Sequence, residues 1–250
     1  MLLNFKKSLG QHFLRSERAL NKIVEAGNIK PGETILEIGS GAGALTEKLL
    51  ATGAKIIAVE KDDQLFELLK NKFGDQLTLI HDDILNFQTS ELPAYKLISN
   101  IPYNITGAIL KKFLSADKKP EKIVLLVQKE VAERTIARDK KESVLSVSVK
   151  AYGKPHYIET VKAGSFAPVP KVDSAIISID NILGNFDEKN FFKVLRVGFS
   201  SKRKKLFSNL SNTFAKEKVE SSFKKLDLDP NIRAEDLSVE NWKNLADCLI

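Results

Sequence analysis

Short apolar runs alternate with amphipathic segments through the first half of the chain. In the runs nearly every side chain is apolar. The predicted strands span residues 35–38, 55–59, 77–80, 95–99 and 123–127. The segments between them carry apolar residues at helical spacing, as in Leu65, Leu69 and Phe73 after a capping Asp62. Apolar strands joined by amphipathic helices are typical of a parallel sheet covered on both faces, so the pattern predicts an α/β domain.

Further elements are predicted on either side of these strands. A helix is expected to begin at Ser16 and to stop at Gly27. Two late strands are expected at 157–161 and 175–179. Residues 143–149 alternate apolar and polar side chains, which fits a strand or one side of a buried helix. The sequence leaves that choice open.

The character of the chain changes near residue 182. Beyond this point the strand-like runs end, and apolar residues such as Phe191, Phe192 and Leu195 recur at helical spacing. We therefore expect an α/β domain over residues 1–182 and a small all-α domain over residues 183–250.

Composition places the chain among ordinary globular proteins. The 250 residues are 43% hydrophobic and 28% charged, and no apolar run approaches the roughly 20 residues of a membrane span. The single cysteine, Cys248, excludes an internal disulfide and fits a reducing compartment. Three scattered histidines give no metal-ligand spacing. We therefore expect a cytoplasmic protein without a membrane span or a bound metal.

Positive charge is concentrated in two places. The formal net charge is +7, and residues 1–22 carry five basic side chains, Lys6 and Lys7 among them, against one acidic side chain. A second basic cluster follows much later at Lys202, Arg203, Lys204 and Lys205. A solvated surface explains either cluster alone. Two clusters flanking a catalytic domain favour a nucleic-acid partner.

A glycine-rich turn follows the first predicted strand. Gly39 and Gly41 lie where a strand passes into a helix, and glycines there let the backbone approach a ligand closely. With Glu60 after the second strand, the spacing also fits a dinucleotide site. A second acid, Asp83, follows the third strand. Ribose hydroxyls on Glu60 and an adenine amino group on Asp83 would fit a nucleoside without a pyrophosphate, S-adenosylmethionine, although either acid could instead cap a helix.

The fourth predicted strand ends in Asn100-Ile101-Pro102-Tyr103. An amide oxygen, a backbone carbonyl and a flat ring at one strand end fit a planar base that carries an amino group, and a simple turn is the alternative. The Asn100 oxygen and the Pro102 carbonyl would accept the two N–H bonds and aim the nitrogen lone pair at a methyl donor. Tyr103 would stack on one face of the base, and Phe166, in a stiff proline-rich loop, would close the other. No general base is needed before transfer.

Taken together, these segments closely resemble the rRNA adenine dimethyltransferases of the KsgA type. The matching pieces lie in the order of that family and span residues 7–14, 37–43, 60, 83, 100–104, 166–175 and 199–204. The chain has His12 where the family often has asparagine, which we treat as tolerated. The resemblance implies a Rossmann-like methyltransferase fold, with a mostly parallel seven-stranded sheet and a small all-α C-terminal domain.

The resemblance also implies the reaction and its partners. The expected reaction is S-adenosylmethionine-dependent dimethylation of two adjacent adenines in a hairpin near the 3′ end of small-subunit rRNA, within an immature 30S particle and by a monomer. The alternatives are a resistance-type enzyme that methylates large-subunit rRNA, a ribosome-assembly factor that binds RNA, and an NAD-dependent oxidoreductase.

The implied site residues fall into three groups. The catalytic group is Asn100, Pro102, Tyr103 and Phe166. The cofactor-binding group is Gln11, His12, Leu14, Glu37, Gly39, Gly41, Glu60, Asp83 and Asn100. The RNA-binding group is Lys6, Lys7, Lys171, Lys202, Arg203, Lys204 and Lys205.

Overall fold

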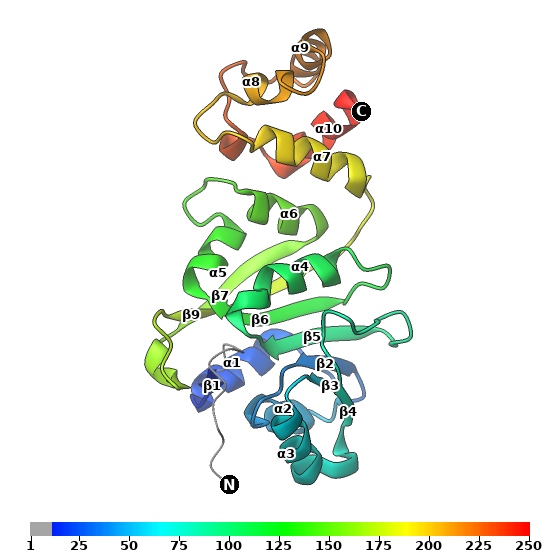
Figure 1. Ribbon diagram of the computed structural model, residues 1–250, viewed down its shortest axis with the longest axis vertical. Helices are drawn as coiled ribbons and strands as arrows, with labels where there is room; N and C mark the ends of the chain where they lie inside the picture. The colour runs from blue at the N-terminus through cyan, green and yellow to red at the C-terminus, as the bar shows by residue number, and fades with distance from the viewer. Residues whose placement is uncertain (1–11) are drawn as a thin grey trace. The chain divides into compact units, whose positions relative to one another are not determined.

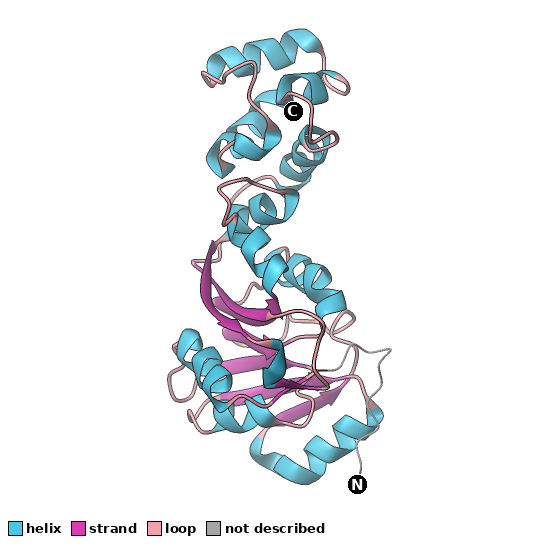
Figure 2. Cartoon of the chain, turned by 90° about the vertical axis from the view of Figure 1, so that its left-hand side faces the viewer, coloured by secondary structure: helices cyan, strands magenta, loops and turns pink. Residues whose placement is uncertain are grey.

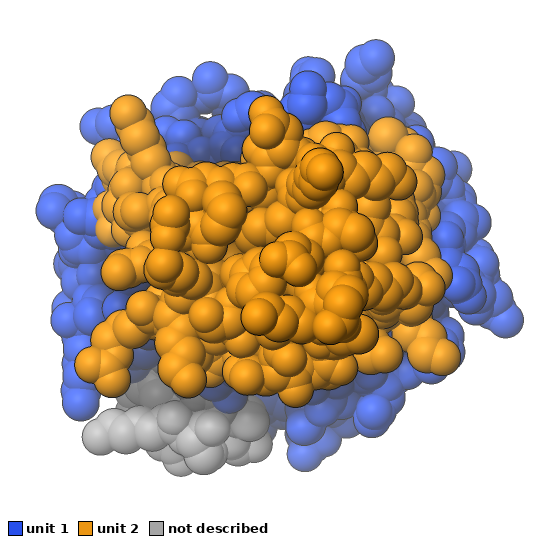
Figure 3. Space-filling view, turned by 90° about the horizontal axis from the view of Figure 1, so that it is seen from above, with its two compact units in different colours: residues 1–132, 154–182 blue, residues 133–153, 183–250 orange. Residues whose placement is uncertain are grey.

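The computed structural model describes residues 12–250, which fold as two compact units (Figure 3). The first unit contains the residues up to Ala132 and residues 154–182. The second contains residues 133–153 and 183–250. The division after Ile182 coincides with the expected boundary, but residues 133–153 were expected in the first domain. Among the described residues, no helix is both long enough and apolar enough to cross a membrane.

A seven-stranded sheet forms the centre of the first unit (Figures 1 and 2). The strand order is β4-β3-β2-β5-β6-β9-β7, parallel from β4 to β6 and antiparallel at β9 and β7. The prediction of a mostly parallel, Rossmann-like sheet is therefore confirmed. Its strands are β2 (Thr34–Ile38), β3 (Lys55–Glu60), β4 (Thr78–His81), β5 (Tyr95–Asn100), β6 (Lys122–Gln128), β7 (Lys154–Val161) and β9 (Ser174–Asp180).

The strand order reverses at β2, which pairs with β3 on one side and β5 on the other. In open α/β sheets, ligands bind outside the carboxyl ends of the strands at such a switch point. The glycine turn and Asn100 follow or end these two inner strands. The topology therefore brings the predicted motifs to one edge of the sheet.

In the described part of the chain, four α-helices belong wholly to the first unit with the sheet. They are α1 (Glu17–Gly27), α2 (Ala44–Leu50), α3 (Asp63–Phe73) and α4 (Thr106–Leu114). Ser16 caps α1 by accepting from the Ala19 N–H, as the sequence predicts. The helix ends at Gly27, as the sequence predicts, and Asn28 caps it in the left-handed conformation. A Cβ at Gly27 would lie 2.6 Å from Ile98 Cδ1 of β5, so the glycine also allows close packing against the sheet.

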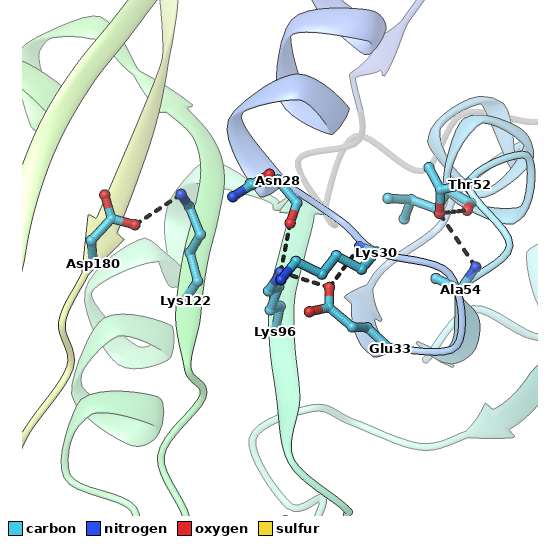
Figure 4. A network of polar contacts seen from close by, with 9 residues as sticks. Asn28, Lys30, Glu33, Thr52, Ala54, Lys96, Lys122 and Asp180 are labelled. Atoms are coloured by element: carbon cyan, nitrogen blue, oxygen red, sulfur yellow. Dashed lines mark hydrogen bonds and ion pairs between the residues drawn. The ribbon is translucent and has the colours of Figure 1, made fainter.

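A network of polar contacts joins α1 to the amino ends of the parallel strands, opposite the carboxyl ends that carry the predicted motifs (Figure 4). Lys96 of β5 is 8% exposed. Its Nζ donates to the carbonyl of Asn28, at the end of α1, over 2.8 Å, and to Glu33 Oε2 over 2.6 Å. A buried charge requires such partners. The network fixes the end of α1 against the sheet.

A short antiparallel ladder connects two segments that are far apart in sequence. Strand β1 (Phe13–Leu14) pairs with β8 (Phe166–Ala167), so that Leu14 lies opposite Phe166. Both side chains are buried in the core beside the sheet. The Arg15 N–H extends the ladder to the carbonyl of Ser165 at 2.8 Å. The ladder anchors the N-terminal segment beside the carboxyl end of the sheet.

The second unit is helical, which confirms the expected helical C-terminal region. Its helices are α6 (Val144–Tyr152), α7 (Glu188–Gly198), α8 (Leu206–Ser211), α9 (Lys216–Lys225) and α10 (Val239–Leu249), and α5 (Lys129–Ile136) spans the division between the units. The segment 143–149, which the sequence leaves open, forms the start of helix α6, with Ser143 as its N-cap. Ser143 and Ser146 form a capping box, and Val147 joins the core of this unit, which explains why the segment belongs to it.

Gly198 offers a test of that core. A Cβ at this helical position would lie 2.8 Å from Trp242 Cζ3 and 2.9 Å from Leu206 Cδ1, and both side chains are fully buried. Gly198→Ala is expected to lower the free energy of unfolding by about 1–3 kcal/mol, because overpacking outweighs the helix propensity of alanine. Gly107→Ala in α4 is the matched control, since a Cβ there meets nothing within 4 Å. Thermal unfolding should show a loss for Gly198→Ala alone, and equal behaviour of the two variants would contradict this packing.

Candidate active site

A cavity of about 510 Å³ opens at the carboxyl ends of β2, β3 and β5. This volume lies in the range of small-molecule sites, which is roughly 300–1,000 Å³. Ten of the predicted site residues line it: His12, Leu14, Glu37, Gly39, Gly41, Glu60, Asp83, Asn100, Pro102 and Tyr103. The structure therefore gathers nearly all of the predicted cofactor residues, and most of the predicted catalytic residues, around one space.

The glycine turn forms one wall of the cavity. Gly39 and Gly41 have φ angles of 62° and 59°, in the left-handed region that side chains rarely adopt. The Gly39 N–H donates to the Val59 carbonyl at 2.8 Å, which holds the turn against β3. A Cβ at Gly41 would also lie 2.9 Å from the Phe13 ring. Glycine is therefore required here both by the backbone angle and by the close approach of the N-terminal segment.

Glu60 ends β3 beside this turn and is 5% exposed. Its Oε1 accepts from the Asp62 N–H at 2.9 Å, and its Oε2 accepts from the Gly41 N–H at 3.3 Å. Burial raises the pKa of this carboxyl above its ordinary value, and the backbone donors oppose that rise. Because each carboxylate oxygen can accept a second hydrogen bond, Glu60 keeps the capacity to accept from two further donors.

Asp83 lies at the same edge, after β4. Its Oδ2 pairs with Lys61 Nζ at 2.8 Å, and its Oδ1 accepts from the Leu85 N–H at 2.9 Å. The hydrogen bond from Lys61 lowers the pKa of Asp83. The side chain is therefore an ionised acceptor already held in place. Lys61 and the neighbouring Asp82 also line the cavity, and sequence reasoning missed them, although each adjoins a predicted acid at a strand end.

The Asn100–Tyr103 segment lines the same cavity, and Pro102 Cδ would lie 3.9 Å from a Cβ at Gly39. Asn100 Nδ2 donates to the His12 carbonyl at 3.4 Å, which leaves the side-chain oxygen outside that contact. Pro102 has φ −59° and ψ 131°, and its carbonyl accepts a long 3.3 Å bond from the Ile105 N–H. Both oxygens are therefore held on a short, stiff segment and retain capacity to accept another donor.

The aromatic ring of Tyr103 is held by two residues from elsewhere in the chain. Its hydroxyl is 2.6 Å from Ser174 Oγ on β9, and burial raises the pKa of the phenol. The His12 ring stacks on it with centroids 5.8 Å apart and an interplanar angle of 22°. His12 Nδ1 in turn donates to the Pro168 carbonyl at 2.8 Å. No sequence spacing indicated these contacts.

Phe166 is the predicted catalytic residue that the structure does not bring to the cavity. Its ring is 2% exposed and belongs to the core beneath the N-terminal segment, where it lies opposite Leu14. The expectation that it closes one face of a base therefore has no support in this arrangement. The proline-rich loop positions Phe166 for packing, because β8 pairs its backbone with β1.

The predicted RNA-binding residues that the structure describes do not line the cavity. Lys171 of the first unit is exposed, and so are the four residues of the basic cluster, Lys202, Arg203, Lys204 and Lys205, in the second. Lys205 Nζ donates to Asn231 Oδ1. Lys6, Lys7 and Gln11 lie outside the described residues.

Glu37 is the most deeply buried acid of the site. It is 1% exposed, and its Oε2 accepts from Thr46 Oγ1 at 2.7 Å. Burial raises its pKa from an ordinary 4.5 to about 7, against hydrogen bonds that lower it. A group of this kind makes the stability of the glycine turn depend on pH near neutrality.

Glu37→Gln is expected to change that pH dependence. The unfolded chain loses the Glu37 proton near pH 4.5 and the folded chain near pH 7. The contribution of Glu37 to the stability of the parent is therefore fully present below pH 4.5, is lost as the pH rises through 7, and then stays constant. The fall is on the order of 3 kcal/mol. The glutamine side chain of the variant has no charge at any pH, so the variant should lack this loss of stability. Denaturant unfolding from pH 4 to 8 would measure the free energy of unfolding of both proteins. Parallel curves for the two proteins would contradict the shift.

The chain as a whole is similar to proteins of one family. Residues 2–250 match the family described as ribosomal RNA adenine dimethylase. A protein of Dehalococcoides mccartyi named ribosomal RNA small subunit methyltransferase A is 43% identical, with 97% of this chain and 88% of that protein covered. A protein of the same name from Thermosynechococcus vestitus is 37% identical, with 99% and 98% covered.

Two solved structures share the fold. A dimethyladenosine transferase from Plasmodium falciparum superposes with a TM-score of 0.82 at 28% identity, covering 94% of this chain and 96% of its own. The 23S rRNA methyltransferase ErmE has a TM-score of 0.77 at 24% identity, covering 95% and 99%. At that identity the second likeness concerns the fold alone. The full-length match and the site gathered around Asn100–Tyr103 lead to one conclusion: the chain belongs to the ribosomal RNA adenine dimethylase family.

Proposed function

We propose that this protein dimethylates the exocyclic amino groups of two adjacent adenines near the 3′ end of small-subunit rRNA, with S-adenosylmethionine as the methyl donor. One observation carries the proposal: the Asn100–Tyr103 segment and the two acids Glu60 and Asp83 line the same cavity. The relatives that are 43% and 37% identical bear the name of small-subunit methyltransferases, which supports this choice of rRNA.

The cavity fits the proposed methyl donor. Glu60 is a buried, doubly braced acceptor suited to two ribose hydroxyls, and Asp83 is an ionised acceptor suited to an amino group. Ile84, 4% exposed, adds an apolar wall, and the Gly39–Gly41 turn lets the backbone approach a ligand closely. When bound, S-adenosylmethionine would supply an electrophilic methyl group.

The residues of the chain position the nucleophile. The lone pair of an adenine amino nitrogen is delocalised into the ring, so the nitrogen is a poor nucleophile. Asn100 Oδ1 and the Pro102 carbonyl would each accept one N–H bond and aim the lone pair at the methyl group. Tyr103 would stack on the extruded base, which contributes roughly 1–3 kcal/mol toward the cost of unstacking it. Good alignment accounts for about 7–11 kcal/mol of a barrier, so this arrangement needs no general base.

The second unit would dock the enzyme on RNA. The exposed basic cluster Lys202–Lys205, together with Lys171 and the N-terminal lysines Lys6 and Lys7, would contact phosphates. In this scheme the residues up to 182 catalyse, the residues beyond 182 bind, and a monomer acts in the cytoplasm on an immature 30S particle. Sedimentation of the purified protein would test the monomer.

Replacing Lys202, Arg203, Lys204 and Lys205 with glutamine is expected to weaken RNA binding. Each lost phosphate contact reduces the slope of log affinity against log salt by about 0.9 or less. Filter binding from 50 to 300 mM salt would measure the slope. The affinity for S-adenosylhomocysteine should be unchanged. An unchanged salt slope would remove this cluster from the proposed RNA surface.

The function is tested by incubating the protein with labelled S-adenosylmethionine and each ribosomal subunit, prepared without its methyl groups. Label is expected in the small-subunit rRNA, on two neighbouring adenines. Label in the large subunit alone would mark an enzyme of the resistance type. RNA binding without any label would mark an assembly factor.

A further inference from the structure

Tyr103 contacts Ser174, a residue that does not line the cavity. Its hydroxyl is 2.6 Å from Ser174 Oγ, although the two residues are 71 positions apart in sequence. Ser174 has no exposed surface, and it is the first residue of β9. In the sheet it lies opposite Gln128 of β6 and Val161 of β7. The hydroxyl that meets Tyr103 therefore belongs to a buried residue on a strand that is paired on both sides.

A second contact restrains the same ring. His12 stacks on Tyr103 at a centroid distance of 5.8 Å. His12 is itself held by its bond to the Pro168 carbonyl. Pro168 lies in the loop that leads into β9, so Ser174 and the anchor of His12 both belong to the segment 166–174. The ring is held at its tip by one residue and on a face by another.

We propose that Ser174 is a positioning residue that fixes the plane of the Tyr103 ring for stacking on the target adenine, an inference that rests on the proposed function. A tyrosine side chain turns about two bonds, and each stacking event must stop that motion. The bond to Ser174 stops it before the base arrives. Such preorganisation improves binding and alignment without a new contact to the substrate.

The effect is specific to the RNA side of the reaction. Loss of the bond should raise KM for RNA and lower kcat, because a loose platform holds the amino group in line less often. The affinity for S-adenosylhomocysteine should not change, since Ser174 is not among the residues that line the cavity.

A double-mutant cycle tests the inference. Ser174→Ala and Tyr103→Phe each remove the same hydrogen bond while keeping the aromatic ring. Each is expected to lower kcat/KM for small-subunit rRNA about tenfold, the loss that follows from one hydrogen bond. The double variant should lose no more than either single one. Ser178→Ala is the matched control, because Ser178 is 2% exposed and lies four residues along the same strand, on the same face.

A second readout separates positioning from stability. With 2-aminopurine at the target adenine, quenching on binding should be weaker in Ser174→Ala than in the parent and in Ser178→Ala. Independent losses that multiply to about a hundredfold would overturn the inference. So would a Ser174→Ala enzyme that matches the parent, or a Ser178→Ala enzyme as impaired as Ser174→Ala. A parent that does not methylate small-subunit rRNA at all would contradict the proposed function, and the inference with it.

Discussion

Asn100→Ala is expected to lower the rate of methyl transfer on the order of 10²–10³-fold, the usual loss for one preorganised polar group that acts in a transition state. The variant loses the acceptor that holds one N–H bond of the target amino group. RNA binding should be largely preserved, because the basic cluster Lys202–Lys205 belongs to the other unit. Single-turnover methylation of small-subunit rRNA, with the RNA affinity measured in parallel, would give both values.

Asn100→Asp is the informative partner of this variant. The aspartate keeps an oxygen acceptor but loses the N–H that Asn100 donates to the His12 carbonyl. If the acceptor matters, Asp should retain far more activity than Ala. If the contact with the N-terminal segment matters instead, the two variants should be equally impaired. An Asn100→Ala enzyme that turns over like the parent would contradict the mechanism.

Glu60→Gln is expected to raise the Kd for S-adenosylhomocysteine by about 10–100-fold, since a hydrogen bond to a charged group contributes roughly 1.5–3 kcal/mol. The amide cannot accept on both of its arms, so one backbone N–H, that of Gly41 or of Asp62, loses its partner. Calorimetry would measure the change, and the affinity for RNA should stay constant.

Glu67→Gln is the control, because Glu67 is an exposed acid on α3. It should bind S-adenosylhomocysteine like the parent. The same titrations with NAD complete the test. Binding of NAD in place of S-adenosylhomocysteine would mean that the glycine turn and Glu60 serve a dinucleotide, which their spacing alone permits.

The sheet and its ligand edge could be predicted because the information is local. Continuous apolar runs mark strands buried on both faces, and each functional motif directly follows or ends such a run. Parallel strands place their carboxyl ends on the same side of the sheet. The topology alone therefore predicts that Glu60 and Asn100 lie close together. The cavity lined by these residues agrees with that prediction.

Residues 143–149 show where local information ends. Alternating apolar and polar residues are typical of a strand with one buried face, but a helix buried on one side can give the same pattern over seven residues. The Ser143–Ser146 capping box and the burial of Val147 against α10 decide for the helix. Val147 belongs to the core of the second unit, so a boundary placed along the chain at residue 182 does not include this segment in that unit.

Contacts across long sequence distances could not be predicted either. The resemblance includes residues 166–175, but it does not reveal that Ser174 meets Tyr103 or that His12 reaches Pro168. For Phe166, the sequence suggested a contact that the structure does not show. A ring in a proline-rich loop was expected at the substrate, whereas pairing of β8 with β1 places it in the core.

The most direct test of the proposed function is mass spectrometry of small-subunit rRNA from cells with and without this protein. The proposed function predicts that two neighbouring adenines near the 3′ end each carry two methyl groups in the first sample. Both should be unmodified in the second, with large-subunit rRNA unchanged. Identical small-subunit spectra from the two samples, or a methyl group lost from large-subunit rRNA instead, would contradict it.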